Sequence, residues 1–241
     1  MKGGAFQLHG LLGADAARRA DAPQHDLLSC AGMTAAVSLW PDSLDGHSAA
    51  PDVLEQRLRD HHHILLAYCG QTGVLPLRFA TVFSSVPALT DTLISRQEVL
   101  LSAYREIADL REYVLQLSVA APPAEAATPP GTGRGFLMSR RQQRDDRQHR
   151  AQRARALAQS VETRVMTIAA RPPRTARPQA GRLLDLSFLV AAGDVDRLAA
   201  LAQEESAAAQ AAGLDLLLTG PWPAYSYTFP ALQDHEVPHG A

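Results

Sequence analysis

The stretch "GVLPLRFATVF", residues 73–83, decides the fold class because the spacing of the hydrophobic residues changes there from helical to alternating. Apolar residues in the preceding segment recur at helical spacing, whereas this stretch alternates as a strand with one face on a core does. The residues predicted to share the inner face are Leu75, Leu77, Phe79, Thr81 and Phe83. Pro76 cannot donate a ladder hydrogen bond, which indicates a strand start or an edge strand.

The segment before it is predicted to be a helix that begins at Pro51 and ends at Gly70 and Gly73. Its apolar face would consist of Leu54, Leu58, His61, Leu65 and Cys69. A second helix is expected over 87–111, and "REYVLQLSV", residues 111–119, again alternates as a strand. Near the N-terminus, "AFQLHGLLG" and "MTAAVSLWP" are predicted to be short strands, with "APQHDLLS" as the connection between them.

Together these elements predict an α+β fold with the helices on one face of a largely antiparallel sheet. "AAPPAEAATPPGTG" interrupts the pattern and is interpreted as an interdomain linker. The expected organisation is an N-terminal domain over 1–121, a Pro/Gly linker over 122–133 and a C-terminal α+β domain over 134–241. The second domain would hold a long Arg-rich helix over 136–171, then a strand, an Ala-rich helix capped by Asp194, and the strand "LDLLL".

Composition places the chain among folded proteins. It has 241 residues, of which 46% are hydrophobic and 20% charged. The net charge of -2 gives no general attraction to nucleic acid or to an anionic membrane. The start "MKGGAFQLHG" lacks the apolar core of a signal peptide, and no apolar run is long enough to span a bilayer, so the expected location is cytoplasmic.

Charged and metal-ligating residues indicate no enzyme site. Successive side chains on a helix point about 100° apart, so His61 to His63 are not expected to share a metal ion. His61 is expected to be a hydrogen-bonded, half-buried histidine on the apolar face, and Cys30 and Cys69 to be buried free thiols. No nucleophile motif or phosphate-binding loop is recognised. The prediction is therefore a protein without catalytic activity, cofactor or metal.

The Arg-rich helix is weighed against nucleic-acid binding. Asp145, Asp146 and Glu162 interrupt its basic residues, and no aromatic residues lie among them for base stacking. A solvated helix face is the favoured interpretation.

The segment "LTGPWPAYSYTFP", residues 218–230, gathers aromatic and turn residues in an aromatic-poor chain. Prolines restrict the backbone, Gly220 permits a turn, and Trp222, Tyr225 and Tyr227 offer large surfaces with one polar tip each. Such a segment serves equally as an exposed docking surface or as a lid over the small C-terminal sheet. Both interpretations stay open here.

Several motifs, in order, resemble the gas vesicle protein F/L family. "LTGPWPAYSY" resembles its C-terminal signature, and "VLPLRFATVF" resembles its N-terminal strand motif, which follows a helix bearing a histidine. "GRGFLMSRR" and "LREYVLQLSV" are similar to the entry to its central helix and to the strand before its linker. Ala80 stands where the family usually has glycine, so a positive φ there would carry strain. Ala224 stands where the family often has a second proline.

The resemblance implies a two-domain α+β protein whose first domain is ferredoxin-like. It implies an accessory or minor structural protein of gas vesicle assembly, associated with the vesicle, that binds the shell protein or other gas vesicle proteins. The composition adds the expectation of a cytoplasmic protein that binds neither nucleic acid nor membrane. The candidate interaction and motif residues are Leu75, Pro76, Arg78, Phe79, Gly220, Pro221, Trp222, Pro223 and Tyr225.

Two alternatives of other classes remain. One is an α+β small-molecule-binding or regulatory module whose aromatic C-terminus lines a pocket. The other is an RNA-binding domain, which would need Phe79 and Phe83 to be exposed on central strands; burial of both favours a plain core.

Overall fold

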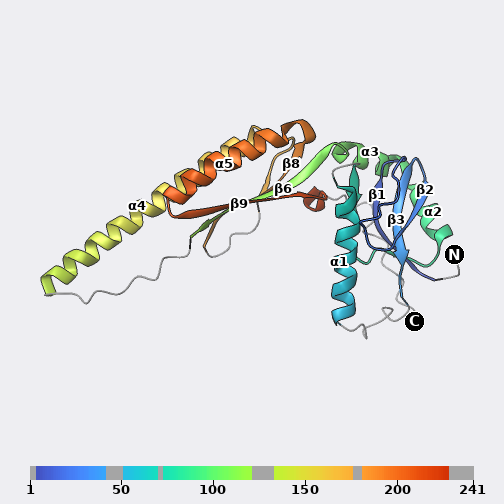
Figure 1. Cartoon of the computed structure of the whole chain (residues 1–241), viewed down its shortest axis with the longest axis horizontal. Coiled ribbons are helices and arrows are strands. Elements are labelled where there is room, and N and C mark those ends of the chain that lie inside the picture. The colour runs from blue at the N-terminus through green and yellow to red at the C-terminus, as the bar shows by residue number, and fades with distance from the viewer. Residues whose placement is uncertain (1–3, 42–50, 70–72, 121–132, 176–180, 228–241) are drawn as a thin grey trace. The chain divides into compact units, whose positions relative to one another are not determined.

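The computed structural model describes residues 4–41, 51–69, 73–120, 133–175 and 181–227, without the side chains of 133–138 (Figure 1). It is a mixed α/β structure with two antiparallel sheets. The chain divides into two compact units, one of residues 1–112 with 221–241 and the other of residues 113–220. This division differs from the expected domains, because the C-terminal segment from Pro221 belongs with the first unit. The expected linker lies almost wholly outside the described residues.

The sheet of the first unit has the order β2-β3-β1-β4, with β5 also pairing with β1. Its strands are β1 (Phe6–Leu12), β2 (Asp26–Cys30), β3 (Met33–Leu39), β4 (Val74–Pro76) and β5 (Val82–Phe83). Pairing is antiparallel throughout, and β1 bulges between Leu8 and Gly10. Pro76 lies on the edge strand β4, as its missing N–H predicts.

Helices cover both faces of this sheet. They are α1 (Pro51–Tyr68), α2 (Val86–Ser95) and α3 (Gln97–Ile107). Figure 1 shows the sheet between α1 on one side and α2 on the other, and all seven residues of β1 are buried. The prediction of helices on one face was therefore wrong for this unit. The ferredoxin-like description of the first domain stays a prediction.

Three local predictions in this unit were also wrong. The expected connection "APQHDLLS" contains β2, which joins β3 through a turn at Ala31 and Gly32, both with positive φ. The expected helix over 87–111 is two helices, since the backbone at Arg96 leaves helical geometry. The alternating stretch is two strands, β4 and β5, because a turn at Ala80 interrupts it.

The second unit has the sheet order β7-β8-β6-β9. Its strands are β6 (Leu110–Val119), β7 (Arg174–Thr175), β8 (Arg182–Ala191) and β9 (Leu214–Trp222). The first residues of β6 and the last residues of β9 belong to the first unit. The helices α4 (Gly133–Met166) and α5 (Val195–Ala211) pack on this sheet around one core, to which Val161, Phe188 and Leu201 belong. Arg164 of α4 binds Glu204 and the buried Glu205 of α5 at 2.6 and 2.5 Å.

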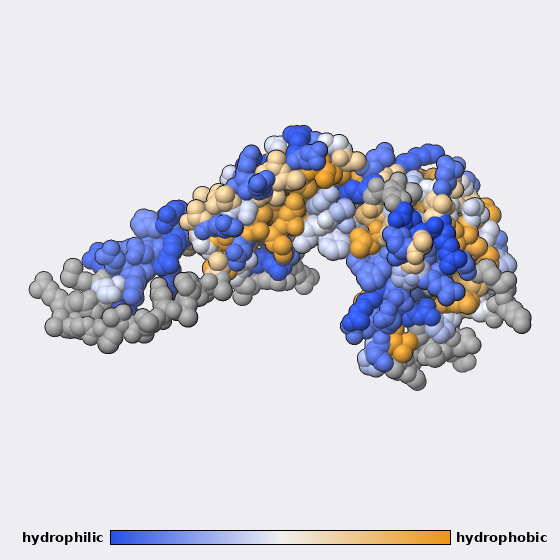
Figure 2. All heavy atoms as spheres, in the orientation of Figure 1, coloured by the Kyte–Doolittle hydropathy of each residue, from blue (hydrophilic) through white to orange (hydrophobic). Residues whose placement is uncertain are grey.

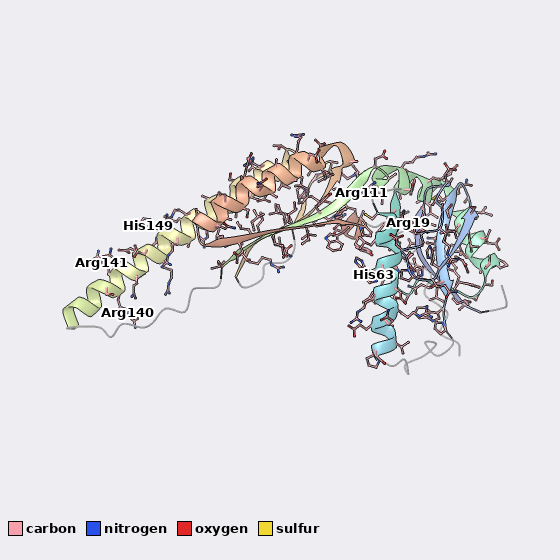
Figure 3. All side chains as sticks on the ribbon, in the orientation of Figure 1. Arg19, His63, Arg111, Arg140, Arg141 and His149 are labelled. Atoms are coloured by element: carbon pink, nitrogen blue, oxygen red, sulfur yellow. The ribbon has the colours of Figure 1, made fainter. Side chains whose placement is uncertain are left out.

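The long Arg-rich helix predicted over 136–171 is confirmed as α4. Among the described side chains of this helix, those from Ala154 onward contribute to the core. Every residue from 139 to 153 is exposed, and Arg140, Arg141 and His149 are labelled on this part in Figure 3. The basic face is thus solvent-exposed, as expected. Among the described residues, no helix is both long and apolar enough to cross a lipid bilayer.

Candidate functional site

The candidate site is a pocket of about 420 Å³ in the first unit. Three segments distant in sequence form it: α1, the residues after β4, and the short helix η3 (Tyr225–Tyr227). The lining residues are Leu58, His61, His62, Leu77, Arg78, Phe79 and Tyr225. The pocket therefore brings together the two sequence motifs that contain all of the candidate residues.

Leu77, Arg78 and Phe79 line the pocket because the chain turns after β4. Leu77 N–H donates to the His9 carbonyl at 3.0 Å, which extends the pairing of β4 with β1 by one residue. The Thr81 hydroxyl and N–H then both donate to the Arg78 carbonyl, at 2.7 and 3.2 Å. This turn places Ala80 at φ 63°, in the left-handed region that favours glycine. Arg78 and Phe79 consequently lie on a turn and not on the continuous strand that the alternation predicted.

The C-terminal motif reaches the pocket through His62 of α1. The His62 Nδ1 and the Tyr225 hydroxyl are hydrogen-bonded at 3.1 Å, and the His62 ring centroid lies 5.6 Å from that of Trp222. Ser226 N–H donates to a carboxylate oxygen of the buried Glu112 at 3.0 Å. Burial raises the pKa of Tyr225, with the nearby Cys69 and Glu112 as further causes. These contacts fix the motif against α1 and β6.

The sequence left two roles open for this motif, a docking surface or a lid over the C-terminal sheet. Its residues from Pro221 onward belong to the first unit, where Pro223 and Ala224 are buried, and Tyr225 contacts α1. The lid interpretation was therefore wrong for these residues. Gly220, with φ 131°, and Pro221 are exposed within β9 and do not line the pocket. Residues 228–230 lie outside the described part of the chain.

A buried polar cluster lies behind the pocket wall. His9 Nδ1 lies 3.0 Å from His61 Nδ1, Gln7 Nε2 lies 3.3 Å from the same atom, and His9 Nε2 lies 2.9 Å from Ser38 Oγ. One set of neutral tautomers is consistent with these contacts: His9 Nδ1–H donates to His61 Nδ1, the Gln7 amide shares the same lone pair at the longer distance, and the Ser38 hydroxyl donates to His9. The His61 ring also hydrogen-bonds the Leu77 backbone.

Burial keeps both imidazoles neutral. It lowers the pKa of His9 to about 3, with the nearby His61, His25 and Arg57 as additional causes. Burial also lowers the pKa of His61 to about 4, with His62 as a further cause. A proton on either ring would have no charge partner in this cluster. His61 is thus a hydrogen-bonded histidine, as expected, although it is more deeply buried than a helix surface position suggests.

The remaining candidate residues serve mainly in packing. Leu75 and Pro76 of β4 are buried, and Pro76 pairs with Gly10. Phe83 is buried, and the half-buried Phe79 packs edge-on against Trp40 and His61. Phe83 is buried and Phe79 is only partly exposed, so the RNA-binding alternative, which required both to be exposed on central strands, is not supported.

The sequence profile described as "Gas vesicle synthesis protein GvpL/GvpF" matches residues 18–228. The chain belongs to this family. The match includes both motifs that meet at the pocket, "VLPLRFATVF" and "LTGPWPAYSY". The family resemblance seen in the sequence is therefore confirmed.

Two solved structures share the fold. The crystal structure of the gas vesicle protein GvpF from Anabaena sp. PCC7120 is 12% identical with a TM-score of 0.68, and the alignment covers 93% of this chain and 96% of that one. The crystal structure of GvpF from Microcystis aeruginosa is 13% identical with a TM-score of 0.62, covering 92% and 98% of the two chains. No curated protein sequence gives a significant match.

The sequence alone predicted neither the pocket nor its full set of lining residues. Leu58, His62 and Leu77 were not among the candidate interaction residues, although they line the pocket. The available signal was the histidine-bearing helix that precedes the N-terminal motif. Its outward histidine, His62, is the residue that the C-terminal motif contacts.

Proposed function

We propose that this protein is a cytoplasmic accessory or minor structural component of gas vesicle assembly, and that it binds the shell protein or another gas vesicle protein through the pocket surface. The observation that carries the proposal is the meeting of both family motifs at one pocket, joined by the His62–Tyr225 contact. Motif residues that lie only in a core are explained by packing. Motif residues that meet at a partly exposed surface favour a role in recognition.

The chemistry of the pocket supports binding and not catalysis. Leu58, Leu77, Phe79 and Tyr225 give it a largely apolar wall. His61 is neutral and its ring nitrogens are engaged within the protein, so it is not poised to exchange a proton with a ligand near neutral pH. The proposal therefore assigns the protein no enzymatic activity and no cofactor.

Co-purification tests the proposed function. A tagged version is co-expressed with the major gas vesicle shell protein, alongside the variants Trp222→Ala and Arg78→Glu. The matched control is Arg141→Glu, an equal charge change on the exposed part of α4. We expect the wild type and the control to retain the shell protein and the two pocket-side variants to lose it, with all variants folded by circular dichroism.

Failure of the wild type to retain the shell protein would contradict direct shell binding. Repeating the experiment with each other gas vesicle protein of the same organism then tests the second part of the proposal. If none is retained, the small-molecule-binding alternative, which the size of the pocket favours, replaces it.

A further inference from the structure

The pocket is open to solvent beside an uncovered apolar surface of α1. Leu58, which lines the pocket, is 49% exposed, and Leu54, one helical turn before it, is 42% exposed. The sequence predicted both residues to be buried, and the structure contradicts this, since the buried face of α1 begins only at His61. Figure 2 shows apolar atoms on the surface near the N-terminal end of α1. The apolar surface therefore extends from the pocket along the helix.

Arg78 supplies the positive charge of this pocket. It is exposed, and among the described residues no carboxylate forms an ion pair with it. No Asp or Glu belongs to the described lining either. The acidic groups on this part of α1 are already engaged, because Glu55 pairs with Arg59 and Asp60 accepts from Gln56. An arginine beside an apolar pocket, with no carboxylate partner in the described part of the chain, is complementary to an anionic ligand.

We propose that the pocket binds a segment of a partner protein in which an apolar side chain enters the cavity and an adjacent carboxylate pairs with Arg78. The partner's flanking apolar residues cover Leu54 and Leu58. A small free carboxylate would fill the pocket but leave this helix surface exposed, which is why the structure favours a protein segment. This inference deepens the proposed function. It rests on that function in one respect, namely that the partner is a gas vesicle protein.

The pocket chemistry is tested without any gas vesicle protein. The probe is 4-phenylbutyrate, an apolar ring with a carboxylate, and its neutral match is 4-phenylbutanamide. Backbone amide shifts of the full chain are followed by NMR during titration with each. We expect 4-phenylbutyrate to shift the signals of His62 and residues 77–79, and to bind at least fivefold more tightly than the amide.

Charge variants assign the effect to Arg78. Arg78→Gln is expected to bind 4-phenylbutyrate at least fivefold more weakly, whereas the control Arg59→Gln, on α1 and paired with Glu55, keeps the wild-type affinity. Arg78→Glu is expected to bind 4-phenylbutylamine in place of the acid. Equal affinity for acid and amide, an unchanged affinity in Arg78→Gln, or no binding at about 10 mM would overturn the inference.

Leu54→Ser distinguishes a protein segment from a small ligand. This variant changes the helix surface outside the pocket, so 4-phenylbutyrate should bind it as it binds the wild type. Retention of the gas vesicle partner found by co-purification should fall at least threefold. Unchanged retention would show that the partner does not cover α1 and would overturn the protein-segment inference. Failure to find any partner, with the probe binding as expected, would instead contradict the proposed function.

Discussion

Ala80 shows how one residue can carry backbone strain at the edge of a site. Its φ of 63° lies in the left-handed region, where the Cβ of an L-residue costs about 1–2 kcal/mol. Glycine avoids this cost but loses more backbone entropy on folding. The sequence predicted strain at this position if its φ were positive, and the φ of Ala80 is positive.

We therefore expect Ala80→Gly to raise the free energy of unfolding of the first unit by about 0.5–1 kcal/mol. Ala80→Val should lower it by at least about 1 kcal/mol, because a β-branched side chain is less tolerated at positive φ. The measurement is urea unfolding followed by tryptophan fluorescence, since both tryptophans, Trp40 and Trp222, lie in the first unit.

A matched control separates this effect from a general response to glycine. Ala103→Gly replaces an alanine in the interior of α3 and should destabilise the same unit by about 1 kcal/mol or more. A destabilising Ala80→Gly would contradict the strain interpretation.

His9 and His61 make the first unit sensitive to acid. Their pKa values are lowered to about 3 and about 4 in the folded protein, whereas an unfolded histidine titrates near 6.5. Between these values the unfolded chain binds more protons, so stability falls as the pH falls below about 6.5. Each histidine contributes a slope that approaches about 1.4 kcal/mol per pH unit.

Unfolding free energies measured between pH 7.5 and 4.5 test this dependence. We expect the loss on acidification to be smaller in His9→Gln, in which one titrating imidazole is removed. His63→Gln, at an exposed position of α1 labelled in Figure 3, should keep the wild-type slope. Parallel pH profiles for the wild type and His9→Gln would show that His9 is not the group responsible.

At the scale of elements, β1 and α1 approach each other closely at Gly10. A Cβ added at this position would lie 2.7 Å from Leu65 Cδ2 and 2.9 Å from the Leu75 carbonyl oxygen. The side chain of Leu65 could move, but the backbone of β4 is fixed by its pairing with β1. Glycine at this position thus allows the helix to lie directly on the strand.

Gly10→Ala is expected to lower the free energy of unfolding of the first unit by about 1–3 kcal/mol through overpacking. Gly193→Ala serves as the control, since a Cβ added there would have no atom within 4 Å and its φ lies outside the left-handed region; it should stay within about 0.5 kcal/mol of the wild type. The same urea series, with circular dichroism for the control, provides the measurement. A neutral Gly10→Ala would mean that α1 can shift away from β1 at little cost.

Periodicity predicted most elements correctly, and the errors have local causes. The pattern identified α1, α4, α5, β1, β3, β6 and β8 because each buries one repeating set of side chains. It missed β2 because Ala31 at positive φ is not a recognisable turn residue, and it merged α2 with α3 because Arg96 is no helix breaker by type. Leu54 and Leu58 fit the helical stripe, but both are exposed in the structure.

The site was predicted only in its parts. Arg78, Phe79 and Tyr225 were singled out by their motifs, and all three line the pocket. Their meeting could not be predicted, because the contact that joins them runs from His62 to Tyr225, 163 residues apart in the sequence. Chain proximity instead suggested the adjacent C-terminal sheet as one of two possible positions for the C-terminal motif. Local patterns contain no information on which distant helix a segment contacts.

At the scale of the whole molecule, the chain returns to the first unit after completing the second. The described core of the second unit lies between Tyr113 and Leu218, whereas Trp222 and Tyr225 contact α1 and Ser226 contacts Glu112. The end of the chain should therefore stabilise the unit that contains its beginning. Truncation after Gly220 is expected to lower the free energy of unfolding of the first unit by at least about 2 kcal/mol, because it removes the side chains of Trp222 and Tyr225.

The matched control ends at Tyr227 and keeps all described residues, so the difference between the two truncations reports on 221–227 alone. Trp40 fluorescence follows the first unit, and far-UV circular dichroism adds the helices α4 and α5 of the second. We expect truncation after Gly220 to move the fluorescence transition to lower urea while the later part of the dichroism transition stays in place. If both transitions moved together, the segment would stabilise the chain as one cooperative unit, and its assignment to the first unit alone would be wrong.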